Sequence, residues 1–317
     1  MNIRLAFMAA LCLALSVPAA AAEPEEQPPV VEYSFAALGD APYNTDEEQQ
    51  FIAMLAEMNR SNLAFAVHVG DFKSATAVCS DEMYFQRRDW FRLSHHPFVY
   101  VPGDNDWTDC YRPFLAGRDP LERLARLRQL FFDTDQALGQ TPLTLTQQLH
   151  VASVPGARYP EHARWVYGRV LHVTLNLPGP NNNRTQMPEE AAQRSAAVHE
   201  WVKSSFAMAR EQRLPGLIFF MQADLWRRNG SPRSAFADLT TELAAEAQAY
   251  PGQVLLVHGD THEFRFGPAL NDPVTRRPVP NVTRLEVYGS PTVNWVKVRV
   301  TVRGESVTYA ASPGSSF

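Results

Sequence analysis

The fold is decided by three stretches in the first third of the chain: Phe-Ala-Ala-Leu-Gly-Asp at residues 35–40, Phe-Ala-Val-His-Val-Gly-Asp at 65–71 and Phe-Val-Tyr-Val-Pro-Gly-Asp at 98–104. Each apolar run is typical of a short buried strand, and each ends in Gly-Asp. In an open α/β sheet, ligands bind beyond the carboxyl ends of the strands. Carboxylates that meet at such a rim repel one another by about 4 kcal/mol per pair at ~4 Å and an effective dielectric of ~20. A cation that joins them removes the repulsion, so the sequence predicts a metal site at the strand ends.

Helical patterns separate these strands. Acidic residues 46–48 open a helix that runs to about residue 62, and a second helix covers about 80–93. This alternation predicts an α/β fold with neighbouring strands parallel. Further along we expect helices over about 120–132, 188–210 and 236–250, irregular structure over 135–160, and strands over 165–175, 217–220, 254–257, 283–289, 293–302 and 306–311.

The first 22 residues have the pattern of a secretory signal peptide. Arg4 precedes an apolar stretch that is too short to span a bilayer, and Ala20-Ala21-Ala22 offers a cleavage site. An uncleaved anchor is the alternative, but acidic residues follow at once. We expect a periplasmic or secreted protein. The remaining residues, 23–317, show no repeat, linker or change of composition, which predicts one domain.

The charge balance argues against nucleic acid as a partner. Cleavage after residue 22 removes Arg4 alone, so the net charge goes from −5 to −6, with 28 Lys and Arg against 34 Asp and Glu. A mildly acidic protein is poorly suited to bind nucleic acid or anionic lipid non-specifically. We expect no membrane association after cleavage, and the sequence gives no indication of the oligomeric state.

Two cysteines, Cys79 and Cys110, remain after removal of the signal peptide. An oxidising compartment and an even count predict one disulfide, with two buried free thiols as the alternative. The pair flanks the second and third Gly-Asp loops, so a bridge would tie these two loops together.

The predicted strand ends carry most of the polar candidates. Residues 258, 260 and 262 alternate, so in an extended stretch they share one face. Oxygen donors with one or two imidazoles suit one or two divalent ions such as Mn²⁺, Mg²⁺ or Ca²⁺, and Zn²⁺ is also compatible. The candidates are Asp40, Asp71, Asp104, Asn105, Asp106, Gln222, His258, Asp260 and His262.

Five segments in this order resemble the calcineurin-like metallophosphoesterases, and the likeness extends over nearly the whole mature chain. They are Gly-Asp-Ala-Pro at 39–42, Gly-Asp at 70–71, Gly-Asp-Asn-Asp at 103–106, Gln222, and Gly-Asp-Thr-His at 259–262. The segments Gly-Asp-Phe-Lys-Ser at 70–74 and Pro-Gly-Asp-Asn-Asp-Trp-Thr-Asp-Cys at 102–110 look like an exported bacterial subgroup. The resemblance implies a four-layer α/β/β/α sandwich of two mixed sheets.

Several positions depart from the family pattern. Pro42, Asn105 and Gln222 stand where the family has histidines, Asp104 replaces an asparagine, and Asp260 replaces another histidine. Carried over residue by residue, one metal would contact Asp40, Asp71 and His262. The other would contact Asp71, Asp104, Gln222 and Asp260, with Asp71 bridging.

The resemblance implies an exported phosphoric ester hydrolase in which a metal-bound hydroxide attacks phosphorus. Asn105 would orient a phosphoryl oxygen, and Asp106, His258 or His68 would protonate the leaving group. Lys73, Asn181 and Asn182 are candidates to contact a small phosphate ester. The alternative is a non-catalytic metal- or ligand-binding protein on the same scaffold. Simpler readings are open for single residues: an aspartate after a strand can be a helix N-cap, and Lys73 a solvated charge.

Overall fold

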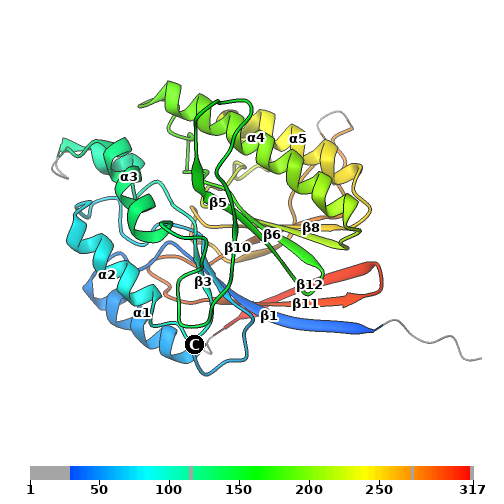
Figure 1. The fold of residues 1–317 in the computed structure, drawn as a ribbon, viewed down its shortest axis with the longest axis horizontal. Coiled ribbons are helices and arrows are strands. Elements are labelled where there is room, and N and C mark those ends of the chain that lie inside the picture. Colours follow the sequence, from blue (N-terminus) through cyan, green and yellow to red (C-terminus); the bar gives the residue numbers. More distant parts are fainter. Residues whose placement is uncertain (1–28, 114–116, 273–274, 315–317) are drawn as a thin grey trace, which may run out of the picture.

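Two β-sheets lie face to face at the centre of the computed structural model (Figure 1). The model describes residues 29–113, 117–272 and 275–314, so the predicted signal peptide lies outside the described residues. The first sheet has the order β12-β11-β1-β2-β3, in which β1, β2 and β3 run parallel and β11 and β12 are antiparallel additions. Its strands are β1 (Val30–Leu38), β2 (Ala66–His68), β3 (Phe98–Tyr100), β11 (Val296–Arg303) and β12 (Ser306–Pro313).

The second sheet has the order β4-β5-β6-β7-β8-β10-β9. Its central strands β6, β7, β8 and β10 are parallel, and the strands at both edges are antiparallel. Both sheets are therefore mixed, as predicted. The strands are β4 (Thr146–Gln148), β5 (Tyr159–Tyr167), β6 (Val170–Thr174), β7 (Gly216–Phe220), β8 (Gln253–His258), β9 (Arg265–Pro268) and β10 (Val282–Glu286).

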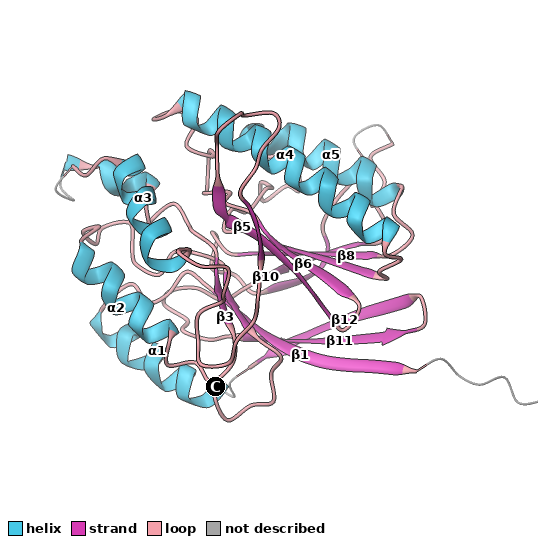
Figure 2. Ribbon diagram, viewed as in Figure 1, coloured by secondary structure: helices cyan, strands magenta, loops and turns pink. Residues whose placement is uncertain are grey.

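Helices cover the outer face of each sheet (Figure 2). α1 (Thr45–Met58), α2 (Asp81–Phe91) and α3 (Pro120–Phe131) flank the first sheet, and α4 (Pro188–Glu211) and α5 (Ala237–Gln248) flank the second. The side chains of Asn44, Ser80 and Asp119 accept hydrogen bonds from backbone amides of the first turns of α1, α2 and α3. These caps satisfy amide groups that a helix start leaves without partners. Two short 3₁₀ helices, η1 (Thr108–Tyr111) and η3 (Ser234–Phe236), complete the order.

Three apolar cores hold the layers together. One lies between the sheets and includes Phe35, Val67 and Ile218. A second joins the first sheet to α1, α2 and α3, and a third joins the second sheet to α4 and α5. Three cores between four layers confirm the predicted α/β/β/α sandwich. Within the described ranges, no helix is long and apolar enough to cross a membrane.

The predicted strand over residues 165–175 was wrong in extent. The structure places a hairpin there, because Gly168 and Arg169 both adopt positive φ (56° and 64°) and turn β5 back into β6. The segment predicted to be irregular, 135–160, contains edge strand β4 and the start of β5, and β9 was not predicted. β4 and β9, with three and four residues, give too little alternation to be recognised.

Candidate metal centre

The carboxyl ends of strands from both sheets meet at one rim. Asp40 follows β1, Asp71 follows β2, and Asp104 follows β3 in the first sheet. Gln222 follows β7 and Asp260 follows β8 in the second. Contacts between the two groups join the rims: the backbone amide of Asp260 donates to both carboxylate oxygens of Asp40, at 3.2 and 3.1 Å. The structure thus brings together side chains more than 200 positions apart.

Glycines precede two of these aspartates because neighbouring carboxylates occupy the space of a side chain. A Cβ placed on Gly103 would collide with the Asp71 carboxylate, and one on Gly259 would collide with the Asp40 carboxylate. Each glycine therefore makes room for the acid of another strand. The Gly-Asp pattern reflects this close approach as well as the strand ends.

The backbone at the rim is strained. Asp40, Asp71, Asp260 and His262 all have positive φ, between 50° and 80°. This region costs an ordinary residue about 1 kcal/mol or more, although aspartate tolerates it better than most. Such residues cluster where a protein must direct side chains toward a common point. Four of them on three loops indicate that the rim is built to gather these side chains.

The Asp71 carboxylate contacts groups from three other loops of the rim. One carboxylate oxygen accepts a hydrogen bond from the Asn105 amide at 3.0 Å. The other accepts from Nε2 of Gln222 at 3.2 Å and faces the Tyr43 hydroxyl at 3.4 Å. The charge of Asp104 also acts on the Asp71 carboxyl and raises its pKa. The role of Asp71 as a bridge between two metals stays a prediction.

Burial and mutual repulsion act on all the rim acids. Burial, followed by the charge of Asp260, raises the pKa of Asp40 well above its ordinary range. Burial and the charges of Asp104, Asp106 and Asp40 raise the pKa of Asp71 in the same way. The pKa values of Asp104 and Asp260 are raised as well, chiefly by burial. Without a cation, the rim disfavours the ionised form of every one of these acids.

His262 presents a nitrogen to the same cluster. Its Nδ1 lies 2.8 Å from the carbonyl oxygen of Ser290, which only accepts, so Nδ1 carries the proton. In the neutral imidazole Nε2 then bears a lone pair, and it lies 3.7 Å from Oδ1 of Asp40 and 3.4 Å from the Tyr43 hydroxyl. A histidine held this way is oriented as metal ligands usually are.

Tyr43 is a member of the site that the sequence analysis missed. Its hydroxyl lies between Asp71, His262 and Asn105, whose Nδ2 donates to it at 3.2 Å. Burial and the surrounding carboxylates raise its pKa above the ordinary value for tyrosine, so the hydroxyl keeps its proton. The only sequence signal is its position three residues after Asp40. A single tyrosine beside a motif is too common to be singled out.

Asp106 joins the loops of the rim through four hydrogen bonds. Its buried carboxylate accepts hydrogen bonds from the backbone amides of Asp71, Phe72 and Gly103 at 2.8–3.0 Å and from the Tyr100 hydroxyl at 2.7 Å. Four donors leave it saturated, and they join the second Gly-Asp loop to the third. These contacts favour a structural role over the predicted role as an acid.

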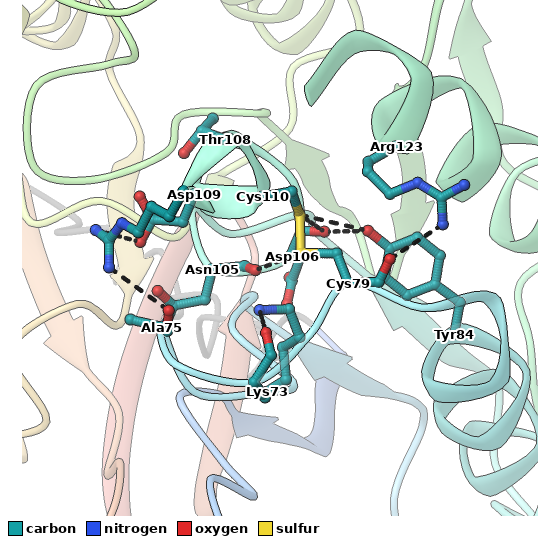
Figure 3. The surroundings of a disulfide bond; sticks show 12 residues. Lys73, Ala75, Cys79, Tyr84, Asn105, Asp106, Thr108, Asp109, Cys110 and Arg123 are labelled. Carbon is teal, nitrogen blue, oxygen red and sulfur yellow. Dashed lines mark hydrogen bonds and ion pairs between the residues drawn. A yellow bond between two sulfur atoms is a disulfide. The ribbon is translucent and has the colours of Figure 1, made fainter. Parts of the chain in front are cut away.

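The predicted disulfide is confirmed beside these loops. Cys79 and Cys110 are bridged, with their Cα atoms 5.8 Å apart (Figure 3). Both residues are fully buried, and the bridge connects the loop after β2 to η1, which follows the loop after β3.

Two predicted residues, Lys73 and Gln222, are engaged elsewhere. Nζ of Lys73 donates to the carbonyl oxygens of Ser74 and Ala77, at 3.1 and 2.9 Å, and is buried there (Figure 3). Gln222 accepts from the Gly179 amide at 2.6 Å, so its amide turns nitrogen rather than oxygen toward Asp71. Gln222 is therefore placed as a bridge between loops and not as the oxygen ligand we predicted. Lys73 closes its own loop instead of facing a substrate.

The asparagine loop and His258 also lie apart from the rim acids. Asn181 donates to Thr185, and Asn182 is buried between Ser195 and Arg194 of α4. Their amides therefore anchor the loop rather than pointing to a substrate. His258 is fully buried on the helix-facing side of its sheet, its Nδ1 2.8 Å from its neighbour's carbonyl oxygen, and burial lowers its pKa to about 4. Its surroundings do not support the predicted role in proton transfer. His68 is likewise buried, and its ring lies against Phe91.

The side chains of the rim are of the types that bind a divalent cation, but they are not already arranged around one. Four carboxylates and an imidazole with a free lone pair form the donor set that Mn²⁺, Mg²⁺, Ca²⁺ or Zn²⁺ binds. As the side chains stand, however, no three His, Cys, Asp or Glu residues in the described part of the chain are arranged to hold an ion. The acids and Tyr43 contact one another instead. These contacts leave the buried acids with raised pKa values, and a cation bound among them would favour their ionised form.

Of the comparisons with known proteins, only the one with solved structures found similar proteins. No family model matches the chain, and no curated protein matches its sequence. The structure of PhoD is similar with a TM-score of 0.52 and 11% identity, over 89% of this chain and 68% of that one. Structures of Vps29 from Cryptosporidium parvum (TM-score 0.31, 11% identity, 90% and 99% covered) and of Vps29 complexed with Zn²⁺ from Entamoeba histolytica (0.27, 10%, 89% and 99%) are more distant. The chain has a metallophosphoesterase-like fold.

Proposed function

We propose that this protein is an exported, metal-dependent phosphoric ester hydrolase. The observation that carries the proposal is the gathering of four carboxylates, two of them buried (Asp40 and Asp71), and His262 at one rim of a metallophosphoesterase-like fold. Uncompensated buried charge is costly, so a rim of this kind is retained where a cation compensates it. The disulfide supports export, because such bonds persist in oxidising compartments.

Asp40, Asp71, Asp104, Asp260 and His262 would hold the metal. A bound divalent cation supplies Lewis acidity toward a phosphoryl oxygen and lowers the pKa of a coordinated water. The protein's own residues do the rest. Asp106 keeps the second and third loops in register, and Ser290 holds His262 with its Nε2 lone pair toward the acids.

Asn105 would contact the substrate. Its backbone amide is fixed by Asp71, and its Nδ2 lies among the polar groups of the rim. An amide does not titrate, so it orients an oxygen without giving up a proton. A small phosphate ester with a good leaving group suits a site of this kind, because such a group departs without protonation.

A non-catalytic metal- or ligand-binding protein is the second candidate. It is favoured by one observation: the groups at the positions of the family's histidines, Asn105 and Gln222, are amides engaged with their neighbours. A binding protein needs the ligands of the rim but no acid.

Turnover and metal content together separate the two candidates. Protein purified from periplasm is analysed for bound metals and assayed on 4-nitrophenyl phosphate and bis(4-nitrophenyl) phosphate, with Mn²⁺ and with chelator. Asp71→Asn is compared with Asp133→Asn, an exposed aspartate outside the rim. Chelator-sensitive turnover that Asp71→Asn abolishes and Asp133→Asn retains supports a hydrolase. Bound metal without turnover supports the binding protein. Both of these results require that the protein binds a metal.

A further inference from the structure

We infer that the Tyr43 hydroxyl is a catalytic hydrogen-bond donor that contacts a phosphoryl oxygen of the substrate. The inference rests on the proposed function and adds a residue to its site. It starts from the position of the hydroxyl, which lies 3.2 Å from Nδ2 of Asn105 and 3.4 Å from both Asp71 and His262.

The donor capacity of this hydroxyl is poorly used within the protein. An O–H···O hydrogen bond is normally about 2.7–2.8 Å long. Both acceptors available to Tyr43 lie at 3.4 Å, so neither holds the proton well. Asn105 donates to the hydroxyl and thereby directs its proton away from the amide. A half-buried O–H group with such distant acceptors can donate to an acceptor that comes closer.

The charge of the rim explains why a neutral donor is useful there. The rim acids repel an anionic substrate wherever a cation does not face it. The nearby ammonium of Lys73 is closed off by two carbonyl oxygens. Hydrogen bonds from Tyr43 and Asn105 can stabilise phosphoryl oxygens without adding a charge that the rim acids would capture.

Tyr43 is held rigidly enough for this role. Its backbone amide donates to Glu47 at 2.8 Å, and the same carboxylate accepts from the Ser290 hydroxyl at 2.7 Å. Ser290 in turn orients His262, whose ring meets the edge of the Tyr43 ring at a centroid distance of 5.4 Å. Buried Glu47 therefore fixes both the tyrosine and the histidine relative to one another.

Tyr43→Phe isolates the hydroxyl, because phenylalanine keeps the ring against His262. The matched control is Tyr111→Phe, which removes an exposed hydroxyl that contacts Gln186 outside the rim. We expect Tyr43→Phe to lower kcat for 4-nitrophenyl phosphate by about 100-fold, as loss of one preorganised donor does. Its affinity for inorganic phosphate, measured by calorimetry, should fall about tenfold or more. Metal content and thermal unfolding should match the wild type, and Tyr111→Phe should leave all four readouts unchanged.

The outcomes separate this inference from the proposed function. Turnover by the wild type with kcat of Tyr43→Phe within twofold would overturn the role of the hydroxyl alone. Loss of metal from Tyr43→Phe along with turnover would also overturn it, because the residue would then act on the metal ligands. A wild type that neither hydrolyses phosphate esters nor binds phosphate would reject both the function and the inference.

Discussion

Removing the disulfide between Cys79 and Cys110 should lower stability strongly while affecting the rim only modestly. The bridge closes a loop with a sequence separation of 31. In the chain-entropy model, a loop of this length contributes roughly 3.7 kcal/mol to the free energy of unfolding, by restricting the unfolded chain. For a protein of this size, that corresponds to a fall in Tm of roughly 7–15 °C.

The arrangement of the rim should be retained because the Asp106 carboxylate joins the same two loops. Asp106 accepts from the amides of Asp71, Phe72 and Gly103 without help from the disulfide. We therefore expect the double variant Cys79→Ala/Cys110→Ala to keep its metal affinity within about threefold. That factor corresponds to a change of ~0.6 kcal/mol in the free energy of metal binding, which a small strain in the loops would cause. Asp106→Asn, which keeps the disulfide but loses acceptors, should weaken metal binding more.

The assay is urea unfolding of the oxidised wild type, the reduced wild type and the double variant, with metal titrations of each. Reductant should destabilise the wild type and leave the double variant unchanged, which controls for other effects of the reagent. The reasoning is refuted if the reduced protein and the double variant unfold within about 1 kcal/mol of the oxidised wild type, which is well below the chain-entropy value. A loss of metal affinity in the double variant larger than in Asp106→Asn would refute the bracing role.

Three further predictions concern single residues. Asp71→Asn should lower bound metal more than Asp40→Asn, because Asp71 is assigned to both metal positions; equal losses would refute the bridge. Asn105→His should speed the hydrolysis of alkyl phosphates more than that of aryl phosphates. The reason is that loss of a general acid lowers the rate roughly 10²–10⁴-fold where the leaving group needs a proton. Equal gains for the two substrates would count against a missing acid at position 105. Burial alone would raise the pKa of Glu161, but the Arg128 guanidinium, bound at 2.6 Å, outweighs it and lowers the pKa to about 2. Because the folded pKa lies below the unfolded value, this stability is present above about pH 4.5 and lost as pH falls toward 2. Glu161→Gln should cost about 3 kcal/mol at pH 7 and flatten the acid limb of stability between those pH values; an unchanged limb would contradict the assignment.

Local sequence patterns determined the layers and the outline of the rim. Apolar runs such as 35–38 and 65–69 give short buried strands, and helical spacing between them forces parallel pairing. The acids that end these runs must then share an edge, whatever the rest of the chain does. The cysteine pairing followed from an even count in a chain predicted to be exported.

The tertiary structure alone decided what each polar side chain at the rim does. Asp106 and Asp104 are two residues apart, yet one braces loops through four hydrogen bonds and the other joins the rim acids. Gln222 turns its nitrogen to Asp71 because the Gly179 amide, from a different loop, takes its oxygen. Such roles depend on donors that distant loops bring to within about 3 Å, and no spacing along the chain encodes those donors. Tyr43 belongs to the site for the same reason. The fold brings Asp71, Asn105 and His262 next to its hydroxyl, and these contacts cannot be predicted from the sequence.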